Sequence, residues 1–273
     1  MTKTYLLRTC TATGQCCDDP NAAGARHHPF IWPESGPVEA SDWTPEPKCG
    51  GGLHGLIDGQ GAVDLLSTAP DARWLVVECD PADVVQIDPS KGKAKRGTVI
   101  YCGAKDGAIA LLQFILPGQP IVYGTATAGD DGTATAGYAG IATAGDDGTA
   151  TAGDDGTATA GDDGTATAGA RGTATAGARG IATAGYAGTA TAGARGIATA
   201  GARGIATAGD DGTATAGDDG TATAGYAGIL SLRWYDGHRY RIATFYVGED
   251  GIEPGVPYRC EAGKAVRVEK EKP

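Results

Sequence analysis

Thr149-Ala150-Thr151-Ala152-Gly153-Asp154-Asp155-Gly156 is one of thirteen tandem copies of an octapeptide that fills residues 125–228. The copies share the form [Thr/Ile]-Ala-Thr-Ala-Gly-x-x-Gly, and a fixed period of this kind is the signature of a repeat architecture. The Thr-Ala-Thr-Ala half alternates with the period of two that is typical of a β-strand, which branched Thr favours. The Gly-x-x-Gly half predicts a tight turn in which glycine supplies the positive φ. Because so short a strand cannot stand alone, the copies are expected to stack into a β-solenoid.

The size of one coil follows from the small side chains available to fill it. Two octapeptides give two strands, two turns and a flat cross-section, whereas three give a triangle. An interior of Ala methyl groups fills a thin sandwich but leaves a void in a triangle, and voids destabilise a protein. We therefore expect a flat parallel solenoid with two octapeptides per coil, and three per coil is the alternative.

The segment that follows the last repeat indicates which face points inward. Ile229-Leu230-Ser231-Leu232 aligns with Thr-Ala-Thr-Ala, so that two leucines fall on the two Ala positions. A capping strand should keep its large apolar side chains on the core side, so Ala is expected inside and Thr outside. The four isoleucines of the repeats, Ile141, Ile181, Ile197 and Ile205, then stand on the outer face. The reverse arrangement, with Thr inside, remains the alternative.

The variable pairs of the turns predict a charged ladder. With two octapeptides per coil, each turn stacks on the turn two repeats later, and Arg179 follows three acidic pairs on the same edge. That ladder comprises Asp130, Asp131, Asp146, Asp147, Asp162 and Asp163. Like charges at strand spacing repel one another, so water and salt must screen them or a cation such as Ca²⁺ must bind. The octapeptide lacks the nonapeptide of calcium-binding β-rolls, so solvated turns are the main interpretation and Ca²⁺ the alternative.

The flanking regions differ in composition from the repeats. Residues 1–124 form a mixed-composition head that we expect to be an α+β domain. Its expected strands are Thr4–Thr9, Arg73–Cys79 and Gly97–Cys102, its helix is Asp106–Leu116, and 32–48 is expected to be loop. Residues 229–273 are expected to form a β-meander cap, with a hairpin at Asp236-Gly237 and strands at His238–Val247 and Lys264–Glu269. Such a cap would cover the open strand edges at the end of a solenoid.

The head contains one short segment with chemical potential, Cys49-Gly50-Gly51-Gly52-Leu53-His54-Gly55. Cys49 and His54 are candidates for a nucleophile and its base. The simpler interpretation is a glycine turn that leads into a helix, and we assign no catalytic residue. The residues Cys10, Cys16, Cys17, His27 and His28 lack the ligand spacing of a zinc site, so no metal site is predicted.

Composition and charge exclude several classes of protein. The chain has 273 residues, 46 of them Gly, and a net charge of −11. An acidic chain of this kind lacks the basic surface expected for nucleic acid or anionic membranes. No apolar run is long enough for a membrane span, and Met1–Thr13 does not read as a signal peptide, so we expect a cytoplasmic protein without membrane insertion. Its seven cysteines are then expected to be reduced thiols.

Outward Thr at the first and third positions of each repeat would form two flat arrays, one on each sheet. This arrangement resembles the Thr-x-Thr faces of insect antifreeze proteins and the sixteen-residue coils of bacterial ice-nucleation proteins. In those families the array orders water to match ice. The resemblance implies an ice-binding face here, and the candidate residues are Thr149, Thr151, Thr157, Thr159, Thr165 and Thr167.

The whole chain also resembles an uncharacterised group of bacterial and phage-associated proteins with a small α+β head, Thr-Ala-rich repeats and a β cap. Trp32–Gly36 and Cys49 with Leu53-His54 carry this likeness. The main prediction is a non-catalytic structural or binding protein, in which a rigid solenoid displays the head. Ice binding is the first alternative. Enzyme activity in the head, which faintly resembles the ADP-ribosyltransferase and RNA phosphotransferase fold, is the second. Self-association through the faces or edges of the solenoid is a further hypothesis.

Overall fold

The computed structural model describes residues 3–15, 30–61, 63–89 and 91–269. The chain divides into two compact units, Met1–Gly124 and Thr125–Pro273, and each has its own hydrophobic core. No helix in the described ranges is long and apolar enough to span a membrane. The cysteine and histidine pairs at 16–17 and 27–28, whose spacing does not favour a zinc site, lie outside the described residues.

The N-terminal unit is built on one antiparallel sheet of seven strands, in the order β2-β7-β4-β1-β3-β6-β5. Leu6, Leu75 and Val77 from its central strands are buried in the core beside Trp32. The helix α1 contacts β4 and β7 and buries Ala108, Ile109 and Leu112. The elements are β1 (Thr4–Cys10), β2 (Gly36–Glu39), β3 (Leu53–Ile57), β4 (Arg73–Cys79), β5 (Val84–Asp88), β6 (Lys91–Ala94), β7 (Arg96–Gly103), α1 (Lys105–Ile115) and two 3₁₀ turns, Val63–Leu65 and Pro81–Asp83.

The three strands and the helix predicted for the head are present as β1, β4, β7 and α1. Four short strands were not predicted. They contain residues that disfavour strands, such as Pro37 in β2 and Gly92 between two lysines in β6. The glycines at 50–52 lead into the strand β3, so the expected helix after them is wrong. Pro37 is tolerated because β2 is an edge strand, where a missing N–H need not break a ladder.

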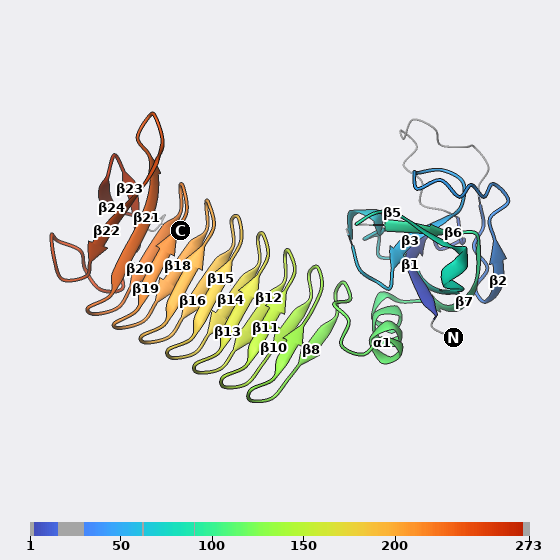
Figure 1. Cartoon of the computed structure of the whole chain (residues 1–273), viewed down its shortest axis with the longest axis horizontal. Helices are drawn as coiled ribbons and strands as arrows, with labels where there is room; N and C mark the ends of the chain where they lie inside the picture. Colours follow the sequence, from blue (N-terminus) through green and yellow to red (C-terminus); the bar gives the residue numbers. More distant parts are fainter. Residues whose placement is uncertain (1–2, 16–29, 62, 90, 270–273) are drawn as a thin grey trace. The chain divides into compact units, whose positions relative to one another are not determined.

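The second unit is a flat parallel β-solenoid with two octapeptides per coil, as the sequence predicted (Figure 1). Strands one coil apart pair in parallel with a shift of sixteen residues, as in Thr157↔Thr173 and Ala158↔Ala174. Alternate repeats therefore contribute to two opposite sheets. The nine-stranded sheet contains β8 (Thr125–Thr127), β10 (Ile141–Thr143), β12 (Thr157–Ala160), β14 (Thr173–Ala176), β16 (Thr189–Ala192), β18 (Ile205–Ala208) and β20 (Thr221–Ala224). The eight-stranded sheet contains β9 (Thr133–Thr135), β11 (Thr149–Ala152), β13 (Thr165–Ala168), β15 (Ile181–Ala184), β17 (Ile197–Ala200), β19 (Thr213–Ala216) and β21 (Ile229–Tyr235).

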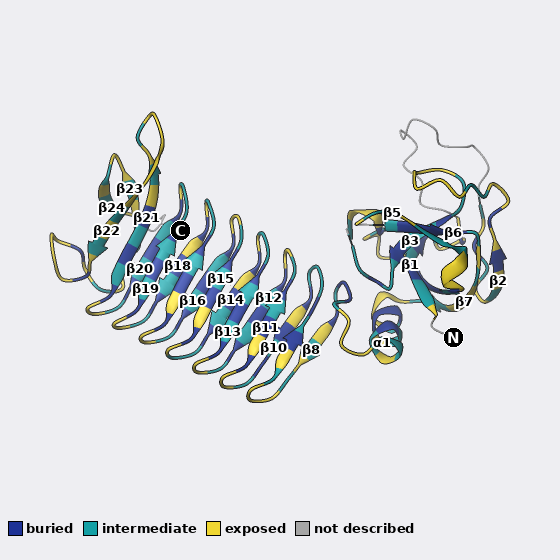
Figure 2. Cartoon of the chain, viewed as in Figure 1, coloured by how far each residue is buried: buried dark blue, intermediate teal, exposed yellow. Residues whose placement is uncertain are grey.

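The space between the two sheets is filled by the alanines of the repeats. Ala158 is 0% exposed and Ala160 is 4% exposed, and the same pattern recurs in every coil from Ala142 to Ala224 (Figure 2). The threonines point outward, and the four repeat isoleucines are 42–49% exposed on the outer faces. The prediction of Ala inside and Thr outside is therefore confirmed. A core of single methyl groups holds the two sheets close together and leaves no room for larger side chains.

Glycine has a different role in the turns from the one expected. The left-handed residue is the second variable residue of each turn, with φ of 56° at Asp131, 49° at Ala139 and 55° at Arg171, and no repeat glycine lies in that region. A Cβ on Gly161 would instead approach the backbone nitrogen of Asp146 in the preceding coil to 2.7 Å. From Gly145 on, the first glycine of each turn is thus required by the close approach of stacked coils, whereas a Cβ on the second glycine, such as Gly164, would first meet the Ala side chain of its own repeat, Ala160, at 2.9 Å. The expectation that the glycines supply the positive φ is wrong.

The C-terminal segment extends both sheets and closes the Ala core. The hairpin of β21 and β22 (Tyr240–Tyr246) continues the eight-stranded sheet, and β23 (Tyr258–Glu261) with β24 (Lys264–Arg267) continues the nine-stranded sheet. Leu230 and Leu232 occupy the inward positions that Ala holds in the repeats and are 0% exposed. Val247, Ile252 and Tyr258 complete this apolar plug. Large side chains thus replace methyl groups only where the solenoid ends.

Candidate functional site: threonine columns and turn ladders

Parallel pairing without a register shift aligns the outward Thr residues into columns. In the nine-stranded sheet the third position of the repeat forms an uninterrupted column: Thr127, Thr143, Thr159, Thr175, Thr191, Thr207 and Thr223. The first position forms a second column beside it, which Ile141 and Ile205 interrupt. Five of the seven solenoid strands in this sheet therefore present Thr at both outward positions.

The eight-stranded sheet carries a similar but less complete pair of columns. Its third-position column is Thr135, Thr151, Thr167, Thr183, Thr199 and Thr215, followed by Ser231. Its first-position column is interrupted by the neighbours Ile181 and Ile197 and then by Ile229. Four of its solenoid strands present Thr at both outward positions.

The six Thr residues predicted as a ligand face are divided between these two surfaces. Thr149, Thr151, Thr165 and Thr167 lie on adjacent strands of the eight-stranded sheet, whereas Thr157 and Thr159 lie on the nine-stranded sheet. The structure therefore does not bring all six together on one face. Neighbouring strands lie about 4.8 Å apart and alternate residues about 6.7 Å apart along a strand, so each face repeats a hydroxyl and a methyl group on a fixed grid.

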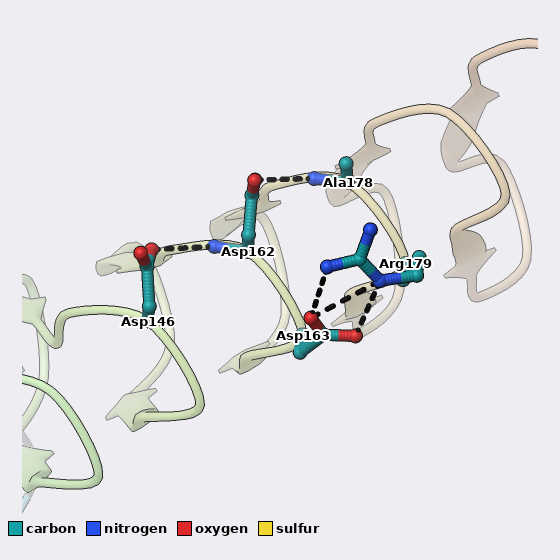
Figure 3. A network of polar contacts seen from close by, with 5 residues as sticks. All are labelled: Asp146, Asp162, Asp163, Ala178 and Arg179. Atoms are coloured by element: carbon teal, nitrogen blue, oxygen red, sulfur yellow. Dashed lines mark hydrogen bonds and ion pairs between the residues drawn. The ribbon is translucent and has the colours of Figure 1, made fainter.

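The acidic turns stack as the sequence predicted, and hydrogen bonds join them from coil to coil. The Asp130 carboxylate accepts the backbone N–H of Asp146 at 3.1 Å. The Asp146 carboxylate accepts the N–H of Asp162 at 2.9 Å (Figure 3). Asp162 in turn accepts the N–H of Ala178 at 2.7 Å. In five of the six Asp-Asp turns the first Asp thus satisfies a turn N–H one coil further on, which the sequence alone did not reveal.

The second residues of stacked turns form ion pairs at three of the four places where the charge changes sign, and the exception is Arg203, which donates to the Tyr186 hydroxyl. The Arg179 guanidinium donates to Asp163 at 2.8 Å, and its hydrogen bond lowers the pKa of that carboxyl (Figure 3). On the opposite edge Arg171 binds Asp155 through two hydrogen bonds of 2.8 and 2.7 Å. Tyr138 also donates its hydroxyl to Asp155. Charged side chains are thus confined to the two turn edges and compensate one another in part.

A metal site does not emerge from these ladders in the described part of the chain. No group of three or more Asp, Glu, His or Cys side chains there lies close enough to hold a metal ion. One oxygen of Asp130, Asp146 and Asp162 is already engaged with a backbone N–H. Calcium binding to the ladder stays a prediction, and it would have to use the remaining carboxylate oxygens.

The two candidate residues of the head have different surroundings. Cys49 is exposed in the glycine loop, and its thiol lies beside Lys91 and raises the pKa of that ammonium group. His54 lies in β3 opposite Lys93 of β6. Burial lowers the pKa of His54 to about 4, with smaller effects from nearby cations, and its Nε2 atom has no hydrogen-bond partner among the described residues.

No hydrogen bond joins Cys49 to His54 within the described head, although a nucleophile and its base need one. Lys93 occupies the adjacent interior. It is fully buried, and its ammonium group donates to Thr44 Oγ1 and to the carbonyls of Lys48 and Gly50. This lysine fixes the loop that carries Cys49, which sequence patterns did not indicate. Enzyme activity in the head stays a prediction.

No protein-family model matches the chain, and no solved structure matches it significantly. Curated relatives are found, however. An ice nucleation protein (InaU) of Pantoea ananas is 37% identical over 115 residues, which are 42% of this chain and 10% of that protein. Ice nucleation proteins of Pseudomonas syringae (35% over 107 residues) and Xanthomonas campestris pv. translucens (37% over 103 residues) match 39% and 37% of this chain. The matches span only 8% and 6% of those two relatives. The repeat region of this chain therefore resembles the ice nucleation proteins, as the Thr-x-Thr pattern indicated.

Proposed function

We propose that the solenoid binds ice through its outward Thr columns. The observation that carries this proposal is the uninterrupted third-position column, which runs from Thr127 to Thr223 on the nine-stranded sheet. A surface that orders water into a lattice must itself repeat hydroxyl and methyl groups at fixed intervals, and Thr supplies one of each. The similarity to ice nucleation proteins supports the same function.

The distribution of charge favours this use of the faces. Within residues 125–228, the outward strand positions hold only Thr and Ile, whereas every Asp and Arg lies at a variable turn position. Charged groups hold their own hydration shells strongly, so their absence from the faces leaves water there to be ordered by Thr. The turn edges then keep the molecule hydrated and soluble.

The nine-stranded sheet is the principal face in this proposal. Its strands β12, β14 and β16 place Thr at both outward positions in three successive coils. The eight-stranded sheet has an equal block at β9, β11 and β13, but Ile181 and Ile197 follow each other directly in its first column. We therefore expect the two faces to differ in activity.

Lysine substitutions on one face at a time test the proposal. One variant carries Lys in place of Thr159, Thr175 and Thr191 on the nine-stranded sheet, and another carries Lys in place of Thr151, Thr167 and Thr183 on the eight-stranded sheet. A control places three lysines in turns, at Ala178, Ala194 and Ala202. The measurements are thermal hysteresis, ice-crystal shaping and the freezing temperature of droplets, with circular dichroism to verify the fold.

We expect the first variant to lose most of the activity, the second to lose less, and the turn control to retain it. Equal losses in all three variants would show that added charge, and not the Thr grid, is responsible. If the folded native protein neither shapes ice nor shifts the freezing temperature, the ice proposal is wrong. The scaffold hypothesis, in which the solenoid only displays the head, would then be the remaining proposal, because each unit has its own core.

A further inference from the structure

The strand β22, which ends the eight-stranded sheet, exposes an unusual number of large apolar side chains. Tyr240 is 50% exposed, Ile242 is 72% exposed and Tyr246 is 51% exposed. These residues alternate along the strand, and they lie opposite outward residues of β21, so they share the outer face of the sheet. Exposed, long and apolar edge strands are rare in isolated proteins because they pair readily with another strand.

The same residues carry the backbone groups of the strand that face the open edge, and among these the carbonyl of Tyr246 already accepts the N–H of Glu249. Val247 donates its N–H to the carbonyl of Gly228, directly opposite in the hairpin, and this fixes the phase of the antiparallel ladder. Arg241, Ala243 and Phe245 therefore bond toward β21. The N–H groups of Tyr240, Ile242, Thr244 and Tyr246 face the open edge, where no described strand pairs with them.

We propose that β22 pairs antiparallel with β22 of a second copy of this chain. With the two-fold axis at Ala243, Tyr240 lies opposite the second copy's Tyr246, and Ile242 lies opposite its Thr244. All edge-facing N–H groups then meet carbonyl partners, because the residues whose backbone groups face the open edge of one strand pair with the same set of residues on the other. The carbonyl of Tyr246 would accept this bond in addition to the one from Glu249. Aromatic and branched residues are the cross-strand pairs that stabilise a sheet most.

The charges at the two ends of β22 favour a second copy in this orientation. The N-terminal end carries the exposed His238 and Arg239, and the C-terminal end is followed by the exposed Glu249 and Asp250. No ion pair engages Arg239, Glu249 or Asp250 among the described residues. The antiparallel arrangement brings the basic end of each copy to the acidic end of the other, whereas a parallel arrangement would place like charges together.

This pairing has two structural consequences. A two-fold axis perpendicular to the sheet closes the assembly at two copies, so the edge is covered without open-ended growth. It also leaves the outer faces of both eight-stranded sheets on the same side, which joins their Thr columns through β21 and β22 into one surface. The dimer itself does not depend on what the Thr columns bind.

The oligomeric state of the full chain tests the proposal. Analytical ultracentrifugation over a range of concentrations should show a reversible monomer–dimer equilibrium. The variant Thr244→Pro removes an N–H that faces the open edge and leaves the ladder to β21 intact, since proline is tolerated on edge strands. We expect it to be monomeric, with unchanged melting. The control Phe114→Gln removes an 83% exposed aromatic side chain from the head and should remain dimeric.

A charge exchange and a cross-link test the register. Arg239→Glu and Glu249→Arg should each weaken the dimer at least tenfold, and the double variant should restore it. Ala243→Cys should give a cross-link between two copies under mild oxidation, located by peptide mapping, because non-hydrogen-bonded antiparallel pairs lie within disulfide reach. A native chain that is monomeric up to its solubility limit, or a dimer that survives Thr244→Pro without this cross-link, would overturn the proposal.

Discussion

The carboxylate of Asp162 accepts a hydrogen bond of 2.7 Å from the backbone N–H of Ala178, which lies one coil further along the solenoid. Ala178 has no acceptor side chain, so it cannot do the same for the next turn. The turn residues therefore differ in how well they connect successive coils, although they share one backbone conformation. An Asp at the first variable position acts as a link between coils as well as a hydrated surface group.

Replacement of Asp162 separates the hydrogen bond from the charge. Asp162→Ala should lower the melting temperature by roughly 1–3 °C, because it removes one exposed hydrogen bond between coils. Asp162→Asn should be neutral or stabilising, since the amide oxygen still accepts the N–H and repulsion from Asp146 is relieved. Ala178→Asn should raise the melting temperature by adding an acceptor. Thermal unfolding followed by circular dichroism measures all three, and equal effects of Ala and Asn would contradict this role.

The Ala core should not tolerate larger side chains. Ala158 is 0% exposed between the two sheets, so Ala158→Leu should destabilise the solenoid by about 3 kcal/mol or more. The matched change Thr157→Leu places the same side chain on the outer face, beside Ile141 of the adjacent strand, and should have little effect. Denaturant unfolding compares the two, and similar losses of stability would mean that the inner face has room to spare.

The two kinds of turn position should respond to substitution in opposite ways. Gly161→Ala should be strongly destabilising, because the new Cβ would lie 2.7 Å from the backbone nitrogen of Asp146. Ala139→Gly should instead stabilise the protein by about 0.5–1 kcal/mol, because Ala139 has a φ of 49° and glycine adopts this region without strain. Melting temperatures of the two variants provide the measurement. A stable Gly161→Ala variant would rule out close stacking as the reason for glycine.

The head should lose stability between about pH 6.5 and pH 4. Burial and nearby cations lower the pKa of His54 to about 4, against the ordinary histidine value of 6.5. In this pH interval the unfolded chain binds a proton that the folded head does not. The stability of the folded head is therefore unreduced by His54 above pH 6.5 and falls as the pH drops toward 4. His54→Gln should flatten this part of the pH profile. Hydrogen exchange of the head at several pH values measures it, and an unchanged profile would contradict the assignment.

The regular part of the molecule was predictable because its information is local and repeated. The octapeptide specifies strand and turn, the Ala methyl groups admit only a thin sandwich, and Leu230 and Leu232 reveal which side is the core. The head was predicted less completely. Its strands β3 and β6 contain Gly55, Gly92 and lysines, and they are stabilised by pairing with segments far away in the chain.

By itself, the sequence determined the two-repeat coil, the inward Ala and the outward Thr, because each copy of the repeat has the same local preferences and thirteen copies reinforce them. Only the tertiary structure decided which Thr residues share a face, since alternate repeats go to opposite sheets. It also decided that glycine serves close stacking and that Lys93 is buried beneath the loop at 44–50. Those features depend on contacts between segments distant in the sequence, and no pattern of neighbouring residues records them.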